Sequence, residues 1–207
     1  MRFSLDGNVI TFDDGGMNLL SSDALRELRA AIASFSGETL IFKMTRAAGA
    51  DMAEMAKFTP LEAYDFARLG QETFAAIERL PGLTIAAIDG DCFGGALDLV
   101  MAFDLRFATE RSRFSHPGAK LGIVTGFGGT SRWRRVIDAA AARKMFLANE
   151  VLSAGEALEV GLIDGIGEAQ VPAIPPFLKE LVRHAPHLSQ RDLVLLADRL
   201  GNIYFGG

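Results

Sequence analysis

Residues 83–100 read LTIAAIDGDCFGGALDLV, and this stretch decides the fold. The apolar run at 83–88 predicts a buried strand, and Gly94 and Gly95 predict a turn behind it. From Ala96 the apolar residues are spaced as in a helix. A strand, a glycine-rich turn and a helix in this order leave the first N–H groups of the helix unpaired and facing a pocket. Such N–H groups are preorganised hydrogen-bond donors, and the helix dipole adds positive potential beside them.

Strands and helices alternate along the chain, which predicts the α/β class. Two further turns of small residues, at 48–50 and at 126–129, repeat the central arrangement. A capping box at 59–62 predicts the start of a long helix, and Pro81-Gly82 predicts its end. The expected strands lie at 2–5, 9–12, 39–44, 83–88, 104–108 and 162–164; one helix is expected to begin at Ser22 and others to lie at 59–80, 131–148 and 153–161; the segment 111–120 is expected to be a polar loop.

Length and composition bound the class of protein. The length of 207 residues suits one domain, and an apolar fraction of 49% allows a sizeable core. We expect a core domain over 1–171 and a short C-terminal helical segment over 172–207, joined at a proline cluster that begins at Pro172.

The charge pattern and the single cysteine exclude several classes. The net charge of −5 provides no basic patch for nucleic acid. Aspartates interrupt the longest apolar stretch, which argues against a membrane span. A single cysteine, Cys92, excludes an internal disulfide, and no cluster of His, Cys, Asp and Glu has metal-ligand spacing. We expect a cytoplasmic protein without a metal.

The glycine-rich turns can be compared with two nucleotide-binding motifs. The P-loop string Gly-x-x-x-x-Gly-Lys followed by Ser or Thr does not occur. Gly126 and Gly128 begin the dinucleotide fingerprint Gly-x-Gly-x-x-Gly, but Ser131 stands where the third glycine belongs. The sequence therefore favours neither a P-loop nor a dinucleotide site.

Several separate runs of the sequence, taken together, resemble the crotonase (enoyl-CoA hydratase/isomerase) family. The resemblance covers the chain from about residue 9 to residue 165. Each run alone would be weak, but the set is specific. The runs are Met17-Asn18-Leu19, Ala48-Gly49-Ala50-Asp51, Ala86-Ala87-Ile88-Asp89-Gly90, Gly94-Gly95, Asp104-Leu105-Arg106, Phe114 with Pro117, Leu121-Gly122-Ile123, Gly126-Phe127-Gly128-Gly129-Thr130 and the segment 152–164.

The resemblance implies a ββα spiral fold that assembles as trimers or as pairs of trimers. It implies an acyl-CoA substrate, with coenzyme A as part of the thioester and no separate cofactor. The chemistry shared by the family is the stabilisation of a thioester enolate by two backbone N–H groups, which fall here on Ala50 and Gly95. Ala48, Gly49 and Gly94 belong to the same binding turns. Physical chemistry supports such a site independently, because a glycine turn supplies a fixed donor with no side chain in the way.

The sequence departs from the family pattern at the residues that move protons. Hydratases of this family use two glutamates; the first falls on Asp98 and the second on Gly118, which has no side chain. Hydration by two carboxylates is therefore disfavoured. His116 is the nearest titratable replacement, and an imidazole exchanges protons near neutral pH.

Two further departures concern coenzyme A and assembly. Gly16 replaces the basic residue that usually helps to hold coenzyme A, so the charge for its phosphates would come from Lys43, Arg46 or Lys57. The helical region after Pro172 is shorter than in the usual family member, where it contributes to trimer contacts and to the acyl pocket.

We predict an acyl-CoA-processing enzyme in which Asp98, together with His116, moves a proton. Double-bond isomerisation, decarboxylation or another enolate protonation is favoured over hydration. Two alternatives remain open: a non-catalytic crotonase fold used for coenzyme A binding or assembly, and a thioester hydrolase in which the aspartate activates water.

Each candidate residue also has a purely structural interpretation. Asp98 can complement the helix dipole, His116 can form hydrogen bonds within its loop, and Cys92 can be a small buried side chain. Phe127 and Trp133 are more typical of core packing than of ligand stacking.

Overall fold

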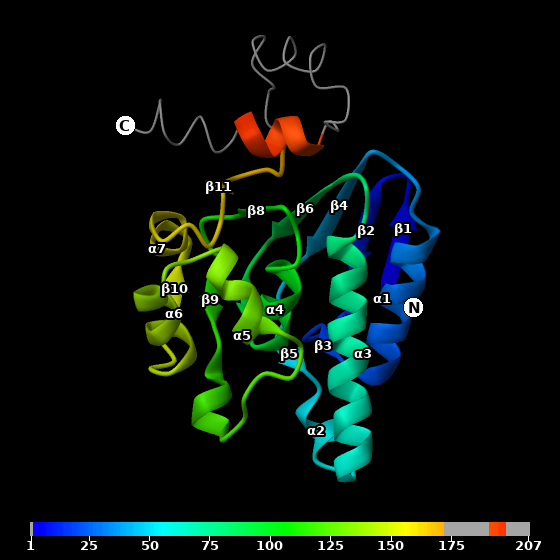
Figure 1. The fold of residues 1–207 in the computed structure, drawn as a ribbon, viewed down its shortest axis with the longest axis vertical. Coiled ribbons are helices and arrows are strands. Elements are labelled where there is room, and N and C mark those ends of the chain that lie inside the picture. Colours follow the sequence, from blue (N-terminus) through cyan, green and yellow to red (C-terminus); the bar gives the residue numbers. More distant parts are fainter. Residues whose placement is uncertain (1, 172–190, 198–207) are drawn as a thin grey trace.

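The computed structural model describes residues 2–171 and 191–197. Its centre is a six-stranded sheet in the order β1-β2-β4-β6-β8-β11 (Figure 1). The first two strands, both predicted from the sequence, form an antiparallel hairpin, and each later neighbour pairs in parallel. The strands are β1 (Phe3–Asp6), β2 (Val9–Phe12), β4 (Thr39–Met44), β6 (Leu83–Ile88), β8 (Leu105–Ala108) and β11 (Gly165–Ile166).

Two smaller sheets carry the segments around the glycine turns. Ala47 joins them, because its N–H donates to the Asp91 carbonyl at 2.7 Å and its own carbonyl accepts from the Phe93 N–H at 3.0 Å. The small-residue segment 48–50 is thereby fixed beside the turn that precedes α4. One sheet has the order β10 (Leu152–Ser153), β9 (Arg113–Ser115), β7 (Asp91–Phe93), and the other pairs β3 (Leu19–Leu20) with β5 (Gly49–Ala50).

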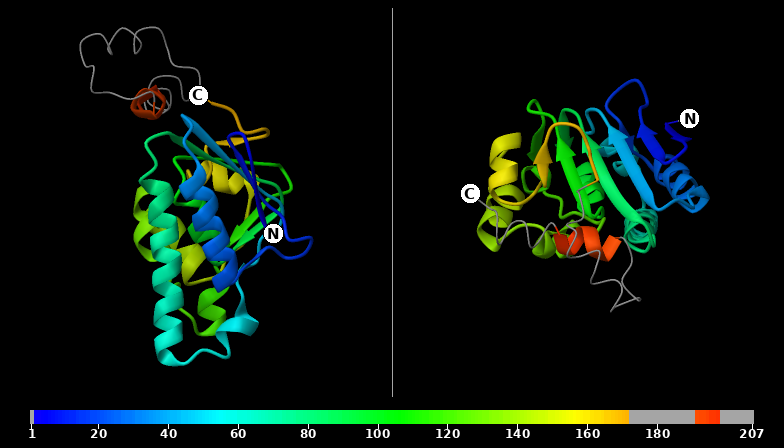
Figure 2. Two further views of the ribbon diagram at one scale, coloured as in Figure 1. Left: turned by 90° about the vertical axis from the view of Figure 1, so that its right-hand side faces the viewer. Right: turned by 90° about the horizontal axis from the view of Figure 1, so that it is seen from above.

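Helices α1 and α3 lie side by side against one side of the large sheet, and the segment 191–197 lies on the same side (Figure 1, Figure 2). The long helix α3 begins where the sequence predicts, with a complete capping box between Thr59 and Glu62. No helix of the described residues is both long and apolar enough to cross a bilayer. The helices are α1 (Ser22–Ser34), α2 (Met52–Met55), α3 (Pro60–Glu78), α4 (Gly95–Val100), α5 (Gly129–Arg132), α6 (Ala139–Phe146) and α7 (Ala154–Glu159), with 3-10 turns at Pro117–Leu121 and Trp133–Arg135.

The core lies between the large sheet and the helices that cover it. Strand β4 buries Leu40, Phe42 and Met44 at alternate positions, which is the period of a strand. Helix α1 buries Leu25 and Leu28 on one face, at the spacing of a helix. The sequence periods therefore fix which side of each element faces inward.

Three predicted elements differ from the structure. The single helix predicted over 131–148 is wrong, because the Asp138 side chain accepts two backbone N–H bonds of 2.7 Å and begins a separate helix, α6. The strand predicted at 162–164 is displaced along the chain, because the strand that forms there is β11 at Gly165–Ile166. The segment 111–120, predicted as a loop, contains strand β9, which pairs in parallel with β7.

The predicted division into a core at 1–171 and a helical segment at 172–207 stays a prediction, because most of that segment lies outside the described residues. The part at 191–197 is helical. Arg191 forms an ion pair with Asp104 at 2.5 Å, and the apolar side of this part packs against β6 and β8.

Candidate active site

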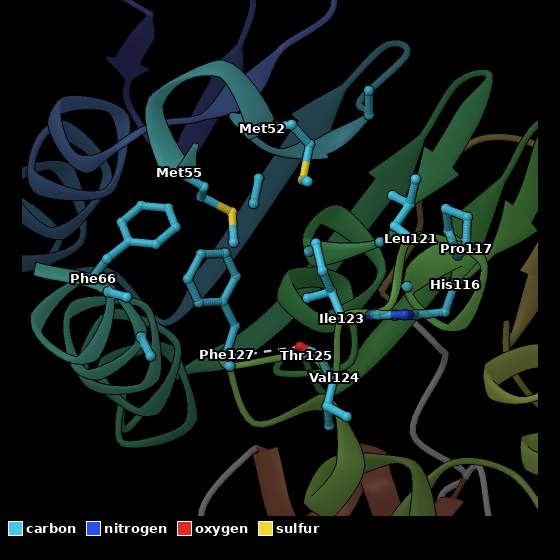
Figure 3. A pocket seen from close by; sticks show the side chains of 18 of the residues that line it. Met52, Met55, Phe66, His116, Pro117, Leu121, Ile123, Val124, Thr125 and Phe127 are labelled. Atoms are coloured by element: carbon cyan, nitrogen blue, oxygen red, sulfur yellow. Dashed lines mark hydrogen bonds between the residues drawn. The ribbon is translucent and has the colours of Figure 1, made fainter. Parts of the chain in front are cut away.

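A cavity of about 280 Å³ lies beside the glycine turn that precedes α4. Its walls are β5, α2, the first turns of α3 and the segment 117–127 (Figure 3). Figure 3 shows Met55, Phe66 and Phe127 on one side of it and His116 on the other. The lining is mostly apolar, so a dipole or charge inside the cavity meets little competition from water.

Two backbone segments approach each other at the wall of this cavity. Gly49 has a φ of +93°, and a Cβ on it would lie 2.6 Å from the Gly95 nitrogen and 2.7 Å from the Phe93 carbonyl oxygen. Only glycine fits such an approach. A Cβ on Gly95 would in turn lie 3.3 Å from the Ala50 nitrogen. The backbones of Ala50 and Gly95 therefore meet at the cavity, which both residues line.

The N–H groups of Ala50 and Gly95 are directed away from the adjoining secondary structure. Asp51 donates its N–H to the Leu20 carbonyl of β3 at 3.2 Å. Successive N–H groups of a strand point to opposite sides, so the Ala50 N–H points away from β3. Gly95 is the first residue of α4 and has no acceptor within that helix. A pair of fixed donors of this kind can hold a negatively charged oxygen.

Asp98 is fully buried on α4 and is not part of the cavity wall. Thr125 donates its hydroxyl to Oδ2 of Asp98, and Oδ1 lies 3.4 Å from Nε2 of His116. A Cβ on Gly129 would lie 1.7 Å from Oδ1, so the carboxylate fills the space that any larger residue at 129 would need. The carboxylate therefore stands behind the cavity, enclosed by its neighbours.

His116 follows β9 and projects into the cavity, as Figure 3 shows. The Gly94 N–H donates to the Ser115 carbonyl at 2.9 Å, which fixes the residue before His116 beside the glycine turn. The imidazole stacks on Phe146, with ring centroids 4.7 Å apart and planes at 29°. Backbone anchoring and ring stacking together define the orientation of the imidazole.

The space at Gly118 is occupied by other groups. A Cβ on Gly118 would lie 2.7 Å from the Ile123 carbonyl oxygen and 3.3 Å from Nδ1 of His116. A glutamate at residue 118 would need the backbone near Ile123 to move. The imidazole therefore stands next to the position from which the second carboxylate is missing.

Not all of the predicted site residues reach the cavity wall. Gly49 is buried at the contact between the two backbones, and Asp98 lies behind His116. The sequence alone does not identify Thr125 as a site residue. Its position just before the 126–129 glycine turn is the only local signal, and its contact with Asp98 on α4 is long-range. The predicted site residues that line the cavity are Ala48, Ala50, Gly94, Gly95 and His116.

Cys92 and Phe127 both lie in the core, as their structural interpretations predict. Cys92 is a buried free cysteine, and burial, aided by the charges of Asp98 and Asp91, raises the pKa of its thiol well above the ordinary value. The thiol therefore stays protonated and is a poor nucleophile. Phe127 is buried edge-to-face against two phenylalanines, and it also lines the cavity.

A second hollow, of about 300 Å³ and polar, lies where β4 and β6 end. Exposed Arg46 and Gly16 line it, together with the ion pair between Asp89 and Arg111. Of the three cations considered for coenzyme A, Arg46 is the one found in this hollow. Within residues 2–171 and 191–197, no group of His, Cys, Asp and Glu side chains is arranged to hold a metal ion.

The sheet topology and the paired N–H groups beside an apolar cavity define a crotonase-type α/β protein. A family model described as enoyl-CoA hydratase/isomerase matches residues 8–190, and the chain belongs to that family. The predicted family and fold are thereby confirmed.

Known relatives include named hydratases. Crotonyl-CoA hydratase of Syntrophomonas wolfei is 33% identical over 158 residues, which is 72% of this chain and 61% of the relative. Short-chain-enoyl-CoA hydratase of Clostridium acetobutylicum is 34% identical over 160 residues, 73% of this chain and 61% of the relative. This chain thus spans about 61% of the length of these curated relatives.

Solved structures share the fold. An enoyl-CoA hydratase from Bacillus anthracis has a TM-score of 0.77 at 26% identity, covering 96% of this chain and 81% of the other. DspI from Pseudomonas aeruginosa has a TM-score of 0.74 at 24% identity, covering 99% of this chain and 85% of the other, which shows the fold alone.

Proposed function

We propose that this protein acts on an acyl-CoA thioester and stabilises the enolate formed from it. The observation that carries the proposal is the close approach of Ala50 and Gly95 at the cavity wall. A thioester oxygen gains negative charge as a proton leaves the neighbouring carbon, so fixed donors stabilise the enolate more than the neutral thioester. Loss of one such donor typically lowers the rate about 10²–10³-fold.

Coenzyme A enters as part of the substrate, and we propose no separate cofactor. Arg46 is our candidate for contact with its phosphates, because it is exposed beside the polar hollow and Gly16 lacks a side chain. A guanidinium suits phosphate because it can form paired, charge-assisted hydrogen bonds.

We favour double-bond isomerisation, decarboxylation or another protonation of the enolate over hydration. Hydration in this family needs a second carboxylate, and Gly118 provides none. The tight contact between Gly118 and Ile123 supports this view, because it closes the space for a longer side chain. The hydratase names belong to the relatives, which carry additional sequence.

We also propose a homotrimer or hexamer. Large apolar side chains are exposed at Leu121, Val124, Leu147 and Val151, and exposed apolar surface often marks a protein contact. The cytoplasmic location remains a prediction.

A panel of thioesters tests the proposed function. The protein is incubated with saturated, 2-enoyl, 3-enoyl and carboxyacyl-CoA compounds, and products are followed by mass spectrometry. We expect conversion of at least one compound and a loss of about 10²–10³-fold in Gly95→Pro, which deletes one donor. Gly155→Ala is the control, because a Cβ there meets nothing within 4 Å.

Two outcomes would favour the alternatives. Binding of these thioesters with no conversion of any of them would support a non-catalytic module. Release of free coenzyme A from a saturated thioester as the main reaction would support a hydrolase.

A further inference from the structure

We propose that His116 is the acid/base residue of this site, that Nδ1 is the atom that carries the proton, and that Asp98 with Thr125 positions the imidazole. The inference rests on the proposed acyl-CoA chemistry and names the group that performs it. It differs from the sequence-based expectation, in which Asp98, together with His116, moves the proton.

The composition of the cavity wall gives the first argument. Among the described residues that line the cavity, His116 is the single titratable side chain. Thr125 is the other polar side chain of the lining, and its hydroxyl is committed to Asp98. A proton that moves between substrate and protein inside this cavity therefore has one acceptor of suitable chemistry.

The enclosure of Asp98 gives the second argument. Its carboxylate is fully buried, with Thr125 on Oδ2 and the backbone of Gly129 packed against Oδ1. No substrate carbon can approach either oxygen while these neighbours remain in place. Asp98 can act only through the imidazole in front of it, which makes it a positioning residue.

Two buried atoms without hydrogen bonds show which nitrogen of the imidazole faces Asp98. Oδ1 of Asp98 and Nε2 of His116 are the buried side-chain polar atoms that lack a hydrogen bond in the described part of the chain. They lie 3.4 Å apart. A small rotation of the ring lets Nε2–H donate to Oδ1, which satisfies both atoms. That arrangement leaves Nδ1 without a proton in the neutral ring, ready to accept one.

The direction of Nδ1 completes the argument. It lies on the Gly118 side of the ring, 3.3 Å from where a Cβ of that residue would stand, and Gly118 also lines the cavity. The basic nitrogen thus lies beside Gly118, where no carboxylate side chain competes with it for the proton. Stacking of the imidazole on Phe146 opposes a rotation that would turn Nδ1 away from Gly118.

The proposed step balances without a further reactant. Nδ1 takes a proton from the carbon next to the thioester carbonyl, or from the allylic carbon of an enoyl chain. The electron pair of the broken C–H bond forms the enolate, whose oxygen is held by the N–H groups of Ala50 and Gly95. The imidazolium then returns a proton to carbon, either at the same position or two carbons away.

Hydrogen exchange measures this step directly. The full chain is incubated with hexanoyl-CoA in D₂O, and deuterium at the α-carbon is followed by mass spectrometry; 3-hexenoyl-CoA is run in parallel for isomerisation. His116→Gln keeps a polar side chain but cannot cycle a proton, so we expect both rates to fall about 10²–10⁴-fold while thioester binding persists. Lys120→Gln, an exposed change on the 3-10 turn that follows His116, should retain the wild-type rate.

The positioning role has its own pair of variants. Thr125→Val removes the hydroxyl that holds Asp98, and Thr125→Ser keeps it. We expect kcat to fall in the valine variant with little change in KM and to recover in the serine variant. This pair also tests the inference if His116→Gln fails to fold, because Thr125 is only half-buried.

The outcomes separate the two proposals. If folded His116→Gln exchanges deuterium at the wild-type rate, the inference is overturned and the proposed function still holds. Equal kcat in the two Thr125 variants overturns the positioning role. A wild type that neither exchanges nor converts any thioester overturns the proposed function, and the inference falls with it.

Discussion

Substitution of Gly49 by alanine tests whether the approach of two backbones sets the chemistry. The backbone there has a φ of +93°, a region that costs a non-glycine residue about 1–3 kcal/mol. The new Cβ would start 2.6 Å from the Gly95 nitrogen and 2.7 Å from the Phe93 carbonyl oxygen, whereas ordinary contact begins at 3.4 Å. Both neighbours are backbone atoms, so the two segments must separate by roughly 0.8 Å to restore ordinary contact.

That separation moves the Ala50 and Gly95 N–H groups relative to each other. A misplacement of about 1 Å at a reacting centre can lower a rate about 10²-fold. We therefore expect Gly49→Ala to melt at a lower temperature and to lose about 10²-fold in kcat at temperatures where it is still folded. The assay compares turnover and melting with those of Gly155→Ala, whose Cβ meets open space. A folded Gly49→Ala protein with wild-type kcat would refute the reasoning.

Three further outcomes are expected. Burial, the largest single influence, raises the pKa of Glu78, but the hydrogen bonds and charges of Arg132 and Arg135 outweigh it and leave the pKa lowered. The stability that this carboxylate contributes is present above its unfolded pKa and is lost as pH falls through the lowered folded pKa, so the melting-temperature gap between wild type and Glu78→Gln should close in acid. Hydration of crotonyl-CoA should be about 10²–10⁴-fold slower than in two-carboxylate hydratases, and Gly118→Glu should not restore it because Ile123 blocks the side chain; a rate equal to theirs would contradict this. Sedimentation should show a trimer or hexamer, and a monomer at all micromolar concentrations would oppose the proposed assembly.

The sequence predicted the fold well for elements that have both a clear start signal and a regular spacing of apolar residues. The capping box at Thr59 and Glu62 is present with both of its hydrogen bonds, and α3 follows it. The glycine turn before α4 follows the apolar run at 83–88 only after a short strand, β7, which the sequence did not predict. The helix over 131–148 failed because alanine-rich periodicity continues past Asp138, whose side chain nevertheless begins a new helix.

The candidate site was only partly predictable. Ala50 and Gly95 belong to recognisable turns, and their meeting at one cavity agrees with the resemblance. The relation between Asp98 and His116 was not readable, because it depends on contacts made by Thr125 and Gly129, far along the chain. Spacing along the sequence cannot reveal which of two titratable groups faces a cavity and which stands behind it.

The most direct test of the central claim is the position of a thioester oxygen in a complex with a non-reactive acyl-CoA analogue. We predict that this oxygen lies within hydrogen-bond reach, about 3.2 Å, of both the Ala50 and the Gly95 nitrogen atoms. An oxygen bound in the same cavity but beyond that distance from either nitrogen would contradict the proposed enolate stabilisation, even though the fold would be unchanged.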